Sequence, residues 1–319
     1  MRTLMYVLKR LLFLVITFFI ILTVTFCLIK MLQAEVPLGP QGQTELARRK
    51  ALGWDKPVLV QYGIYLRNLF TKFDIGTSLK VAYMQPVAKV IAERMPPTLL
   101  MNILSIVLGL PLGVALGIFA ALKKNTWIDH VISVIIVLFI SVPSFVLAFF
   151  LQYFLSFKLG WFPLVMYSKA EAGGLVTWKM IYSLMLPIMA SAFYEIAFFA
   201  RNIRAELTEA LTSDYMLLAR TKGLTQSKAV THHALKNAMV PILPSVIGTF
   251  LSVMGGSMIL ERIFAVPGVG DLSLKALSTL DYDLFVGTAM FYTLIGLLSG
   301  ILTDLSYGFL DPRIKMGER

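Results

Sequence analysis

Long apolar runs with few or no charged residues are the feature that most constrains this chain of 319 residues. The first covers residues 11–29 and is long enough to cross the hydrocarbon core of a bilayer as an α-helix. Because lipid offers no hydrogen-bond partner to a peptide group, such a segment has to satisfy its own backbone, which a helix does. With 57% hydrophobic and 15% charged residues, the chain fits a polytopic membrane protein and not a soluble domain.

Six such segments are expected to cross the membrane. Their predicted ranges are 11–29, 99–122, 131–157, 181–199, 240–260 and 285–310. The 29 Lys and Arg against 18 Asp and Glu can indicate nucleic-acid binding, but these cations lie beside the apolar runs and form no basic motif interleaved with aromatic residues. They favour a topology with both termini in the cytoplasm, as the positive-inside rule requires. The sequence thus predicts an all-α, multi-pass membrane protein with no nucleic-acid partner.

The expected spans divide the chain into four parts. These are an N-terminal transmembrane helix over 1–30, an extracytoplasmic insert over 31–97, a core of five transmembrane helices over 98–310 and a cytoplasmic tail over 311–319. One apolar helix face in the insert is predicted from the spacing of Leu59, Tyr62, Leu66, Leu69 and Phe73. This helix is expected to lie on the membrane surface or over the outer ends of the spans, either packing the insert or docking an outside partner.

Three glycines recur every four residues in the second span, at Gly109, Gly113 and Gly117. Positions four apart lie on one helix face, and small residues on such a face let two helix backbones approach closely in lipid. We expect a tight packing seam there, within the subunit or against a partner.

Spans three to five carry the candidate pathway residues Pro143, Ser144, Ser252 and Gly255. A proline frees a backbone carbonyl, and small polar side chains leave room for a passage, although both also occur in simple kinks and close helix packing. Glu195 in the fourth span has two interpretations, a functional site within the membrane or an ion pair with Arg201 at the cytoplasmic surface. Its position near the inner end of the span favours the ion pair.

The polar stretch over 201–244 is predicted to form a helix, a glycine turn and a second helix. Its apolar face is expected from Met216, Leu217, Leu218 and Ala219. Gly223 supplies the left-handed residue that ends a helix. Between two expected spans, such a unit would form a rigid helical loop on the cytoplasmic side, where it could contact a partner protein.

No motif for a common catalytic chemistry is present. The sequence holds no G-x-x-x-x-G-K-[ST] phosphate loop and not one Gly-Lys pair, so it does not bind ATP by that route. It also lacks H-E-x-x-H and G-x-S-x-G, and its three histidines form no metal-binding pattern. We therefore expect no enzyme activity and no metal or cofactor bound by this chain.

Ordered motifs give a family resemblance over nearly the whole chain. They occupy 52–57, 61–62, 74–78, 93–98, 141–145, 159–163, 214–215, 219–224, 233–238, 267–270, 281–282 and 310–313. Among them are ARTKGL at 219–224 and PGVG at 267–270. Together they resemble the permease subunits of the dipeptide, oligopeptide and nickel family of binding-protein-dependent ABC importers, most closely the oligopeptide permease B subunits of Gram-positive bacteria.

The resemblance implies a type I ABC importer permease fold in a bacterial cell membrane. It also implies that 201–240 is the EAA-type coupling loop, whose short helix sits in a groove of a cytoplasmic ATPase subunit. Ala219 and Gly223 match that motif, whereas Leu217 and Leu218 stand where the motif has its glutamate and first alanine. The residues expected for ATPase coupling are Asp214, Tyr215, Ala219, Arg220, Lys222, Gly223 and Leu224.

The function implied by the resemblance is ATP-driven import of oligopeptides, with this chain forming half of the translocation pathway. The implied partners are a homologous second permease, two cytoplasmic ATPase subunits and an extracytoplasmic peptide-binding lipoprotein. ATP and Mg²⁺ are expected on the ATPase subunits. Import of dipeptides or nickel within the same family stays open, as do a stand-alone secondary transporter or channel and a membrane scaffold without transport.

Overall fold

The computed structural model describes residues 2–32, 40–51, 53 and 55–310, and these are almost entirely helical. The α-helices are α1 Arg2–Met31, α2 Pro40–Ala51, α3 Val58–Lys72, α4 Val87–Leu122, α5 Trp127–Ser141, α6 Ser144–Leu151, α7 Lys169–Ala172, α8 Trp178–Ser183, α9 Met185–Leu211, α10 Asp214–Thr221, α11 Gln226–Ala229, α12 Leu235–Met239, α13 Leu243–Ser252, α14 Met258–Ile263, α15 Val269–Ser278 and α16 Tyr282–Leu310. Two π-helical segments, η1 Gln152–Lys158 and η2 Val230–Ala234, and the 3₁₀ turn η3 Val253–Gly255 join them. The expected tail over 311–319 lies outside the described residues, as do Leu52 and Trp54 of the first family motif.

Three helices in the described ranges are long and apolar enough to cross a membrane, namely Met5–Met31, Val87–Leu122 and Tyr282–Gly308. Two further segments qualify only as bent pairs, with angles of 102° between α5 and α6–η1 and 53° between α11–α12 and α13–η3. The expected third and fifth spans are therefore broken helices. The fourth expected span lies in α8 and α9. However, α9 is not among the helices that are both long and apolar enough to cross a membrane. The number of six spans stays a prediction.

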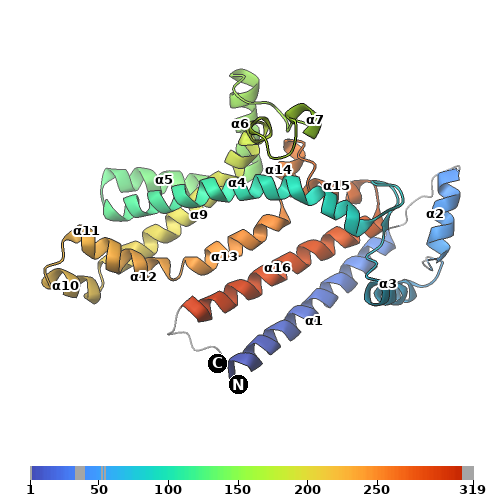
Figure 1. Cartoon of the computed structure of the whole chain (residues 1–319), viewed down its shortest axis with the longest axis horizontal. Helices are drawn as coiled ribbons and strands as arrows, with labels where there is room; N and C mark the ends of the chain where they lie inside the picture. The colour runs from blue at the N-terminus through green and yellow to red at the C-terminus, as the bar shows by residue number, and fades with distance from the viewer. Residues whose placement is uncertain (1, 33–39, 52, 54, 311–319) are drawn as a thin grey trace.

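The contact of α4 with α9 is the most extensive between any two helices (Figure 1). The three glycines of the expected seam face α9. A Cβ added to Gly113 would lie 2.8 Å from the carbonyl oxygen of Ile196 and 2.9 Å from Cβ of Phe199. A Cβ added to Gly117 would lie 2.7 Å from the carbonyl oxygen of Ala200. The two backbones thus meet at a distance that only glycine allows, and the seam lies within the subunit.

The carboxylate of Asp281 holds the loop between α3 and α4 to the start of α16, with a further contact from the Thr77 backbone N–H to Asp283 at 3.3 Å. Asp281 accepts hydrogen bonds from the Ser78 hydroxyl at 2.6 Å and from the backbone N–H groups of Lys80 and Val81, each at 3.0 Å. The strands β1 Thr77–Ser78 and β2 Gln85–Pro86 pair antiparallel in this loop. Asp281 is buried, so these donors satisfy a charge that burial would otherwise make costly.

The helix that carries the second expected span begins within the expected insert. α4 begins at Val87 and runs without interruption to Leu122, so the boundary expected between residues 97 and 98 falls inside a helix. Pro96 and Pro97 lie within α4. A proline pair is a common helix end, but here the helix continues, with the neighbouring Thr98 fully buried.

The predicted helix of the insert is α3, and it packs against α1. Tyr62 donates to or accepts from the Thr23 hydroxyl at 2.7 Å, and Leu66 and Leu69 join the same apolar cluster. Leu59 and Phe73, expected on this face, are instead 74% and 87% exposed. Both lie at the helix ends, where Phe73 adopts a left-handed conformation with φ of 51° that turns it off the helical face. The helix therefore covers the C-terminal half of α1.

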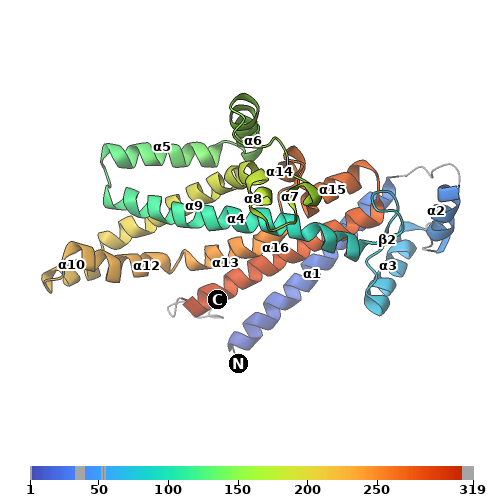
Figure 2. The same cartoon turned by 45° about the horizontal axis from the view of Figure 1, so that its top comes forward.

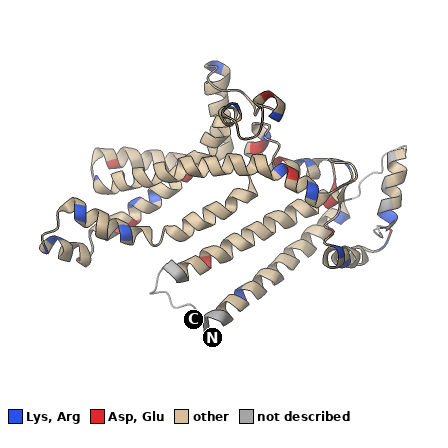
Figure 3. Ribbon diagram, viewed as in Figure 1, with Lys and Arg blue, Asp and Glu red and all other residues tan. Residues whose placement is uncertain are grey.

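The two ends of the molecule differ in what they carry. The helices α10 to α12 lie at one end of the long axis, and α2 and α3 lie at the other (Figure 2). Charged residues are sparse along the middle of α1, α13 and α16 and denser at the two ends and in the loops (Figure 3). This distribution matches helices whose middle parts lie in lipid.

Replacing Gly113 with alanine is expected to force α4 and α9 apart. Overpacking of this kind costs about 1–3 kcal/mol, so Gly113→Ala should lower the unfolding temperature of the detergent-solubilised protein. The matched control is Gly296→Ala in α16, because a Cβ there meets no atom within 4 Å. Equal unfolding temperatures for the two variants would contradict the seam.

Replacing Asp281 with asparagine is expected to release the loop that it holds. Hydrogen bonds to a charged group contribute about 1.5–3 kcal/mol each, so amide hydrogen exchange at residues 79–81 should accelerate by about tenfold or more in Asp281→Asn. Asp214→Asn is the control, since Asp214 is exposed. Unchanged protection of these amides would show that other contacts hold the loop.

Candidate functional site

A cavity of about 420 Å³ lies where α4, α5, α6, α9 and the segment around η3 meet. Its polar lining residues are Asn102, Ser105, Ser144, Ser191, Tyr194, Glu195, Ser252 and Ser257. The other lining residues have no polar group in their side chains. Hydroxyl and amide groups gathered in this way, within otherwise apolar helices, can hold water and a polar solute.

Two helix breaks open onto this cavity. The first is the 102° bend after Val142, where Pro143 begins the turn into α6. The second lies at Gly256 and Ser257, between η3 and α14, and is separate from the 53° bend between α12 and α13. The Asn102 amide donates to the Val253 carbonyl oxygen at 2.7 Å, which satisfies one backbone group beside the second break. Irregular backbone at membrane depth is tolerated where it is buried in protein or lines an aqueous cavity. The two breaks therefore fit the wall of a passage.

The structure brings three of the four candidate pathway residues to this cavity. Pro143, Ser144 and Ser252 line it. Gly255 does not, and a Cβ on it would approach the ring of Tyr292 at 3.9 Å instead. The neighbouring Gly256 lines the cavity in its place.

Glu195 also lines the cavity, and the favoured ion pair with Arg201 is not formed. Among the described residues Glu195 makes no ion pair or hydrogen bond, and Arg201 is exposed. The physical reason is the helical period: positions six apart are rotated by about 240° and lie on different faces of α9. The interpretation as a surface pair was therefore wrong.

Four lining residues with small polar side chains were not among the candidate pathway residues. Asn102, Ser105, Ser191 and Ser257 are isolated polar residues inside or beside apolar runs. The Ser105 hydroxyl is buried and has no hydrogen-bond partner. In the sequence these four residues differ from their neighbours only in being polar within or beside an expected span. That difference indicates a site only once the structure shows that all four line the same cavity.

A buried carboxylate network packs against Gly256 of the cavity wall. Glu261 is fully buried and accepts hydrogen bonds from the Thr98 hydroxyl at 2.8 Å and from the backbone N–H of Asp271 at 3.0 Å. Burial raises the pKa of the Glu261 carboxyl, and these donors act in the opposite direction. A Cβ on Gly256, which has φ of +63°, would lie 2.5 Å from Oε1 of Glu261. The network therefore fixes the backbone at the second break.

The helix α10 ends in a left-handed glycine turn. The N–H of Gly223 donates to the carbonyl of Arg220 at 3.0 Å, and the N–H of Leu224 donates to that of Ala219 at 3.3 Å. This is the Schellman pattern, and it requires the φ of +86° that Gly223 adopts. The turn expected from the sequence is thus built by two hydrogen bonds that set the angle between α10 and the next segment.

The apolar residues of α10 divide between two faces. Met216 and Ala219 are buried against Leu207, Ala210 and the segments that follow. Leu217 and Leu218 point outward and are 64% and 56% exposed. The single apolar face expected from four consecutive residues was wrong, because consecutive positions are 100° apart on a helix.

The other residues proposed for coupling lie on the outside of this unit. Asp214, Tyr215, Arg220, Lys222, Gly223 and Leu224 are exposed. Ala219 is the exception, since it packs inward. Leu217 and Leu218 were not among the proposed contacts, yet they add the largest exposed apolar area of α10. An exposed apolar spot rimmed by charges is typical of a protein interface.

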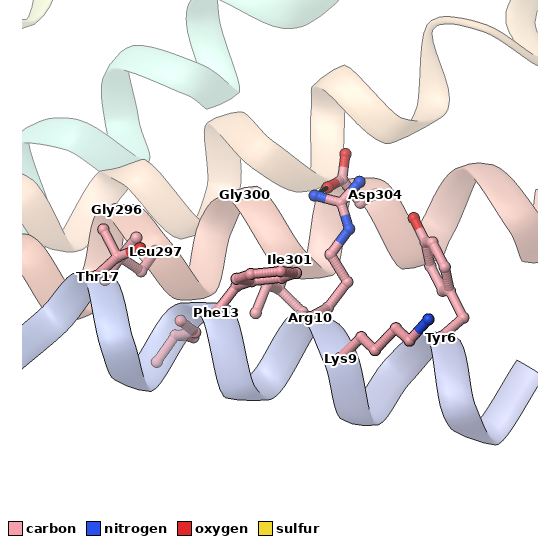
Figure 4. Close-up of a pocket in the computed structure, with 11 residues that line it drawn as sticks. Tyr6, Lys9, Arg10, Phe13, Thr17, Gly296, Leu297, Gly300, Ile301 and Asp304 are labelled. Atoms are coloured by element: carbon pink, nitrogen blue, oxygen red, sulfur yellow. Dashed lines mark ion pairs between the residues drawn. The ribbon is translucent and has the colours of Figure 1, made fainter. Parts of the chain in front are cut away.

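A second cavity of about 540 Å³ lies between α1 and α16 (Figure 4). Arg10 pairs with Asp304 at 2.6 Å, and its guanidinium lies 5.4 Å from the Tyr6 ring centre. Gly296 and Gly300 leave the space open on the side of α16. Across the part of the chain that the structure describes, no group of three or more His, Cys, Asp or Glu side chains is placed to hold a metal ion.

Known proteins are similar to this chain over nearly its whole length. Residues 113–316 match the family described as "Binding-protein-dependent transport system inner membrane component", and residues 3–102 match the corresponding N-terminal family. The dipeptide transport system permease protein DppB of Lactococcus lactis is 33% identical, over 98% of this chain and 99% of its own length. The glutathione transport system permease protein GsiC of Shigella flexneri is also 33% identical, over 97% and 98%.

A solved structure shares the fold. An inward-facing form of the MetNI methionine ABC transporter aligns with a TM-score of 0.50 at 16% identity, covering 69% of this chain and 97% of the other. The expected type I ABC importer permease fold and the family resemblance are therefore confirmed. The chain belongs to the family of binding-protein-dependent transport system inner membrane components, and it is a permease subunit of an ABC importer.

Proposed function

We propose that this chain imports peptides, oligopeptides among them, as half of an ATP-driven translocation pathway. The observation that carries the proposal is its 33% identity, over nearly the full length of both chains, to a dipeptide permease. A second permease subunit supplies the other half, and an extracytoplasmic lipoprotein delivers the peptide. Two cytoplasmic ATPase subunits bind ATP and Mg²⁺. Both termini of this chain lie in the cytoplasm.

The structure suggests how ATPase movement reaches the cavity. Met216 and Ala219 fix α10 to Leu207 and Ala210 at the end of α9. From there α9 runs as one helix of 27 residues, about 40 Å at 1.5 Å per residue, and its other half carries Ser191 on the cavity wall. A displacement of α10 therefore moves a cavity wall through a continuous helix.

A bidentate ion pair stiffens this connection. Arg204 of α9 donates from Nε and Nη2 to the two carboxylate oxygens of Asp129, at 2.6 and 2.9 Å. Asp129 also accepts from the backbone N–H of Asn125 at 3.0 Å. The loop between α4 and α5 is thus tied to α9 close to α10, and planar bidentate pairing fixes orientation as well as distance.

Reconstitution of the complete complex in proteoliposomes tests the function. Labelled di-, tri- and pentapeptides and Ni²⁺ are supplied with the binding protein, with and without ATP inside. ATP-dependent accumulation of peptides is the expected result. Accumulation of Ni²⁺ without peptide accumulation would show that the complex imports nickel. Flux through this chain without ATP or partner subunits would contradict the proposed ATP-driven import.

Gly223→Val is expected to abolish coupling while leaving the chain inserted. The left-handed conformation costs a β-branched residue at least about 1–2 kcal/mol, so the turn after α10 should change its angle. Co-purification of the ATPase subunits and ATP-driven uptake should both fall. The control is Gly173→Val, since Gly173 has φ of +75° with the same open surroundings in another loop. Normal uptake by Gly223→Val would remove the coupling role of the turn.

Leu218→Asp tests the exposed apolar spot on α10. A charge in the centre of a docked interface costs about 2 kcal/mol or more, so the dissociation constant for the ATPase subunits should rise by at least about tenfold. Leu218→Met keeps the apolar volume and should bind as the wild type does. If both variants bind alike, the contact lies elsewhere on α10 to α12.

A further inference from the structure

We propose that Glu195 is a cation-recognition site within the translocation pathway. It would bind the N-terminal ammonium group, or a Lys or Arg side chain, of a peptide in transit. The inference rests on the proposed function, because it names the part of a peptide that this chain itself recognises. It adds a charge preference that acts after the binding protein has released its cargo.

The Glu195 side chain has a position built for it. A Cβ added to Gly109 of α4 would lie 2.6 Å from Cβ and 3.5 Å from Cγ of Glu195. The absent side chain at position 109 therefore leaves the space that the stem of Glu195 occupies. With its stem held against α4, the carboxylate is directed by packing and not by a neighbouring cation.

The carboxylate has no counter-charge. Among the residues that the structure describes, Glu195 makes no ion pair, and no Lys, Arg or His lines the cavity. The other lining groups that can form hydrogen bonds are neutral amides, hydroxyls and backbone. A charge in a membrane segment is costly and is found where it faces a water-filled cavity and serves a function. The cavity therefore holds a carboxylate to which no cationic side chain of the described residues is paired.

A second acceptor lies one helical turn away. Ser105 precedes Gly109 by four positions, so both lie on the same face of α4. Ser105 lines the cavity and is 2% exposed, and its buried hydroxyl has no hydrogen-bond partner. An ammonium group carries three donors and no acceptor. Ser105 and Glu195 together offer acceptors of the kind that such a group requires.

The expected consequence is selection by peptide charge during translocation. A tripeptide with a lysine side chain gains an attraction to Glu195 beyond that of its N-terminus, whereas a glutamate side chain is repelled. Because the site lies in the permease, the preference should persist when the binding protein is saturated with either peptide. This separates it from selection by the binding protein.

The test compares Ala-Lys-Ala with Ala-Glu-Ala in proteoliposomes that hold the complete complex, each peptide saturating the binding protein. The ratio of the two ATP-driven uptake rates should fall by about fivefold in Glu195→Gln, the effect of one partly screened charge pair. Glu195→Lys should invert it. Glu195→Asp keeps the charge and should keep the ratio, even at a lower rate. Glu209→Gln, on the exposed cytoplasmic part of the same helix, is the matched control.

Because each ratio is taken within one variant, partial loss of folded protein cancels. A structural role for Glu195 would lower both rates equally, and this outcome overturns the inference, as does an unchanged ratio in Glu195→Gln. Peptide uptake with unchanged ratios would leave the proposed function standing. Absence of peptide uptake by the wild-type complex would overturn the proposed function and the inference together.

Discussion

The close approach of α4 and α9 is the contact on which the rest of the structure depends. Without a hydrophobic force between helices in lipid, such a contact is held by dispersion between surfaces that fit closely. Gly113 and Gly117 allow it by removing the side chains that would meet the carbonyls of Ile196 and Ala200. The same seam aligns the two helices that carry much of the polar cavity wall.

This arrangement places two functions on one helix. The N-terminal half of α9 borders the cavity, and its C-terminal part holds α10 and the bidentate ion pair of Arg204 with Asp129. A helix anchored along its length by a glycine seam moves as a rigid body and bends little. The breaks are found in the partner segments, at Pro143 and Gly256, where the chain can change direction beside an open volume.

The sequence predicted those local features that follow from the spacing of residues along one helix. The four-residue glycine spacing indicated one packed face, and Gly223 indicated a left-handed helix end. The partner of the glycine face could not be predicted, because spacing says nothing about which helix lies opposite. The same limit explains the ion pair of Asp129 with Arg204, which joins residues far apart in the chain.

Features that depend on three-dimensional arrangement were missed or misjudged. The continuation of α4 through Pro96 and Pro97 and the 102° bend after α5 both contradict simple boundaries drawn from proline and hydropathy. Leu217 and Leu218 turn away from Met216, since a run of four apolar residues wraps around a helix. The polar cavity became visible only when residues from four separate segments were placed around one volume.

Because Gly109 leaves the space that the Glu195 side chain occupies, substitutions at positions 109 and 195 are expected to depend on each other during evolution. If a larger residue arose at 109, it would displace the carboxylate as well as the helix, so a change in packing would also change the charge of the passage. A smaller neutral residue at 195 would have to come first for such a change to be tolerated. Positions 109 and 195 are therefore expected to vary together among relatives, with the order of their substitutions constrained.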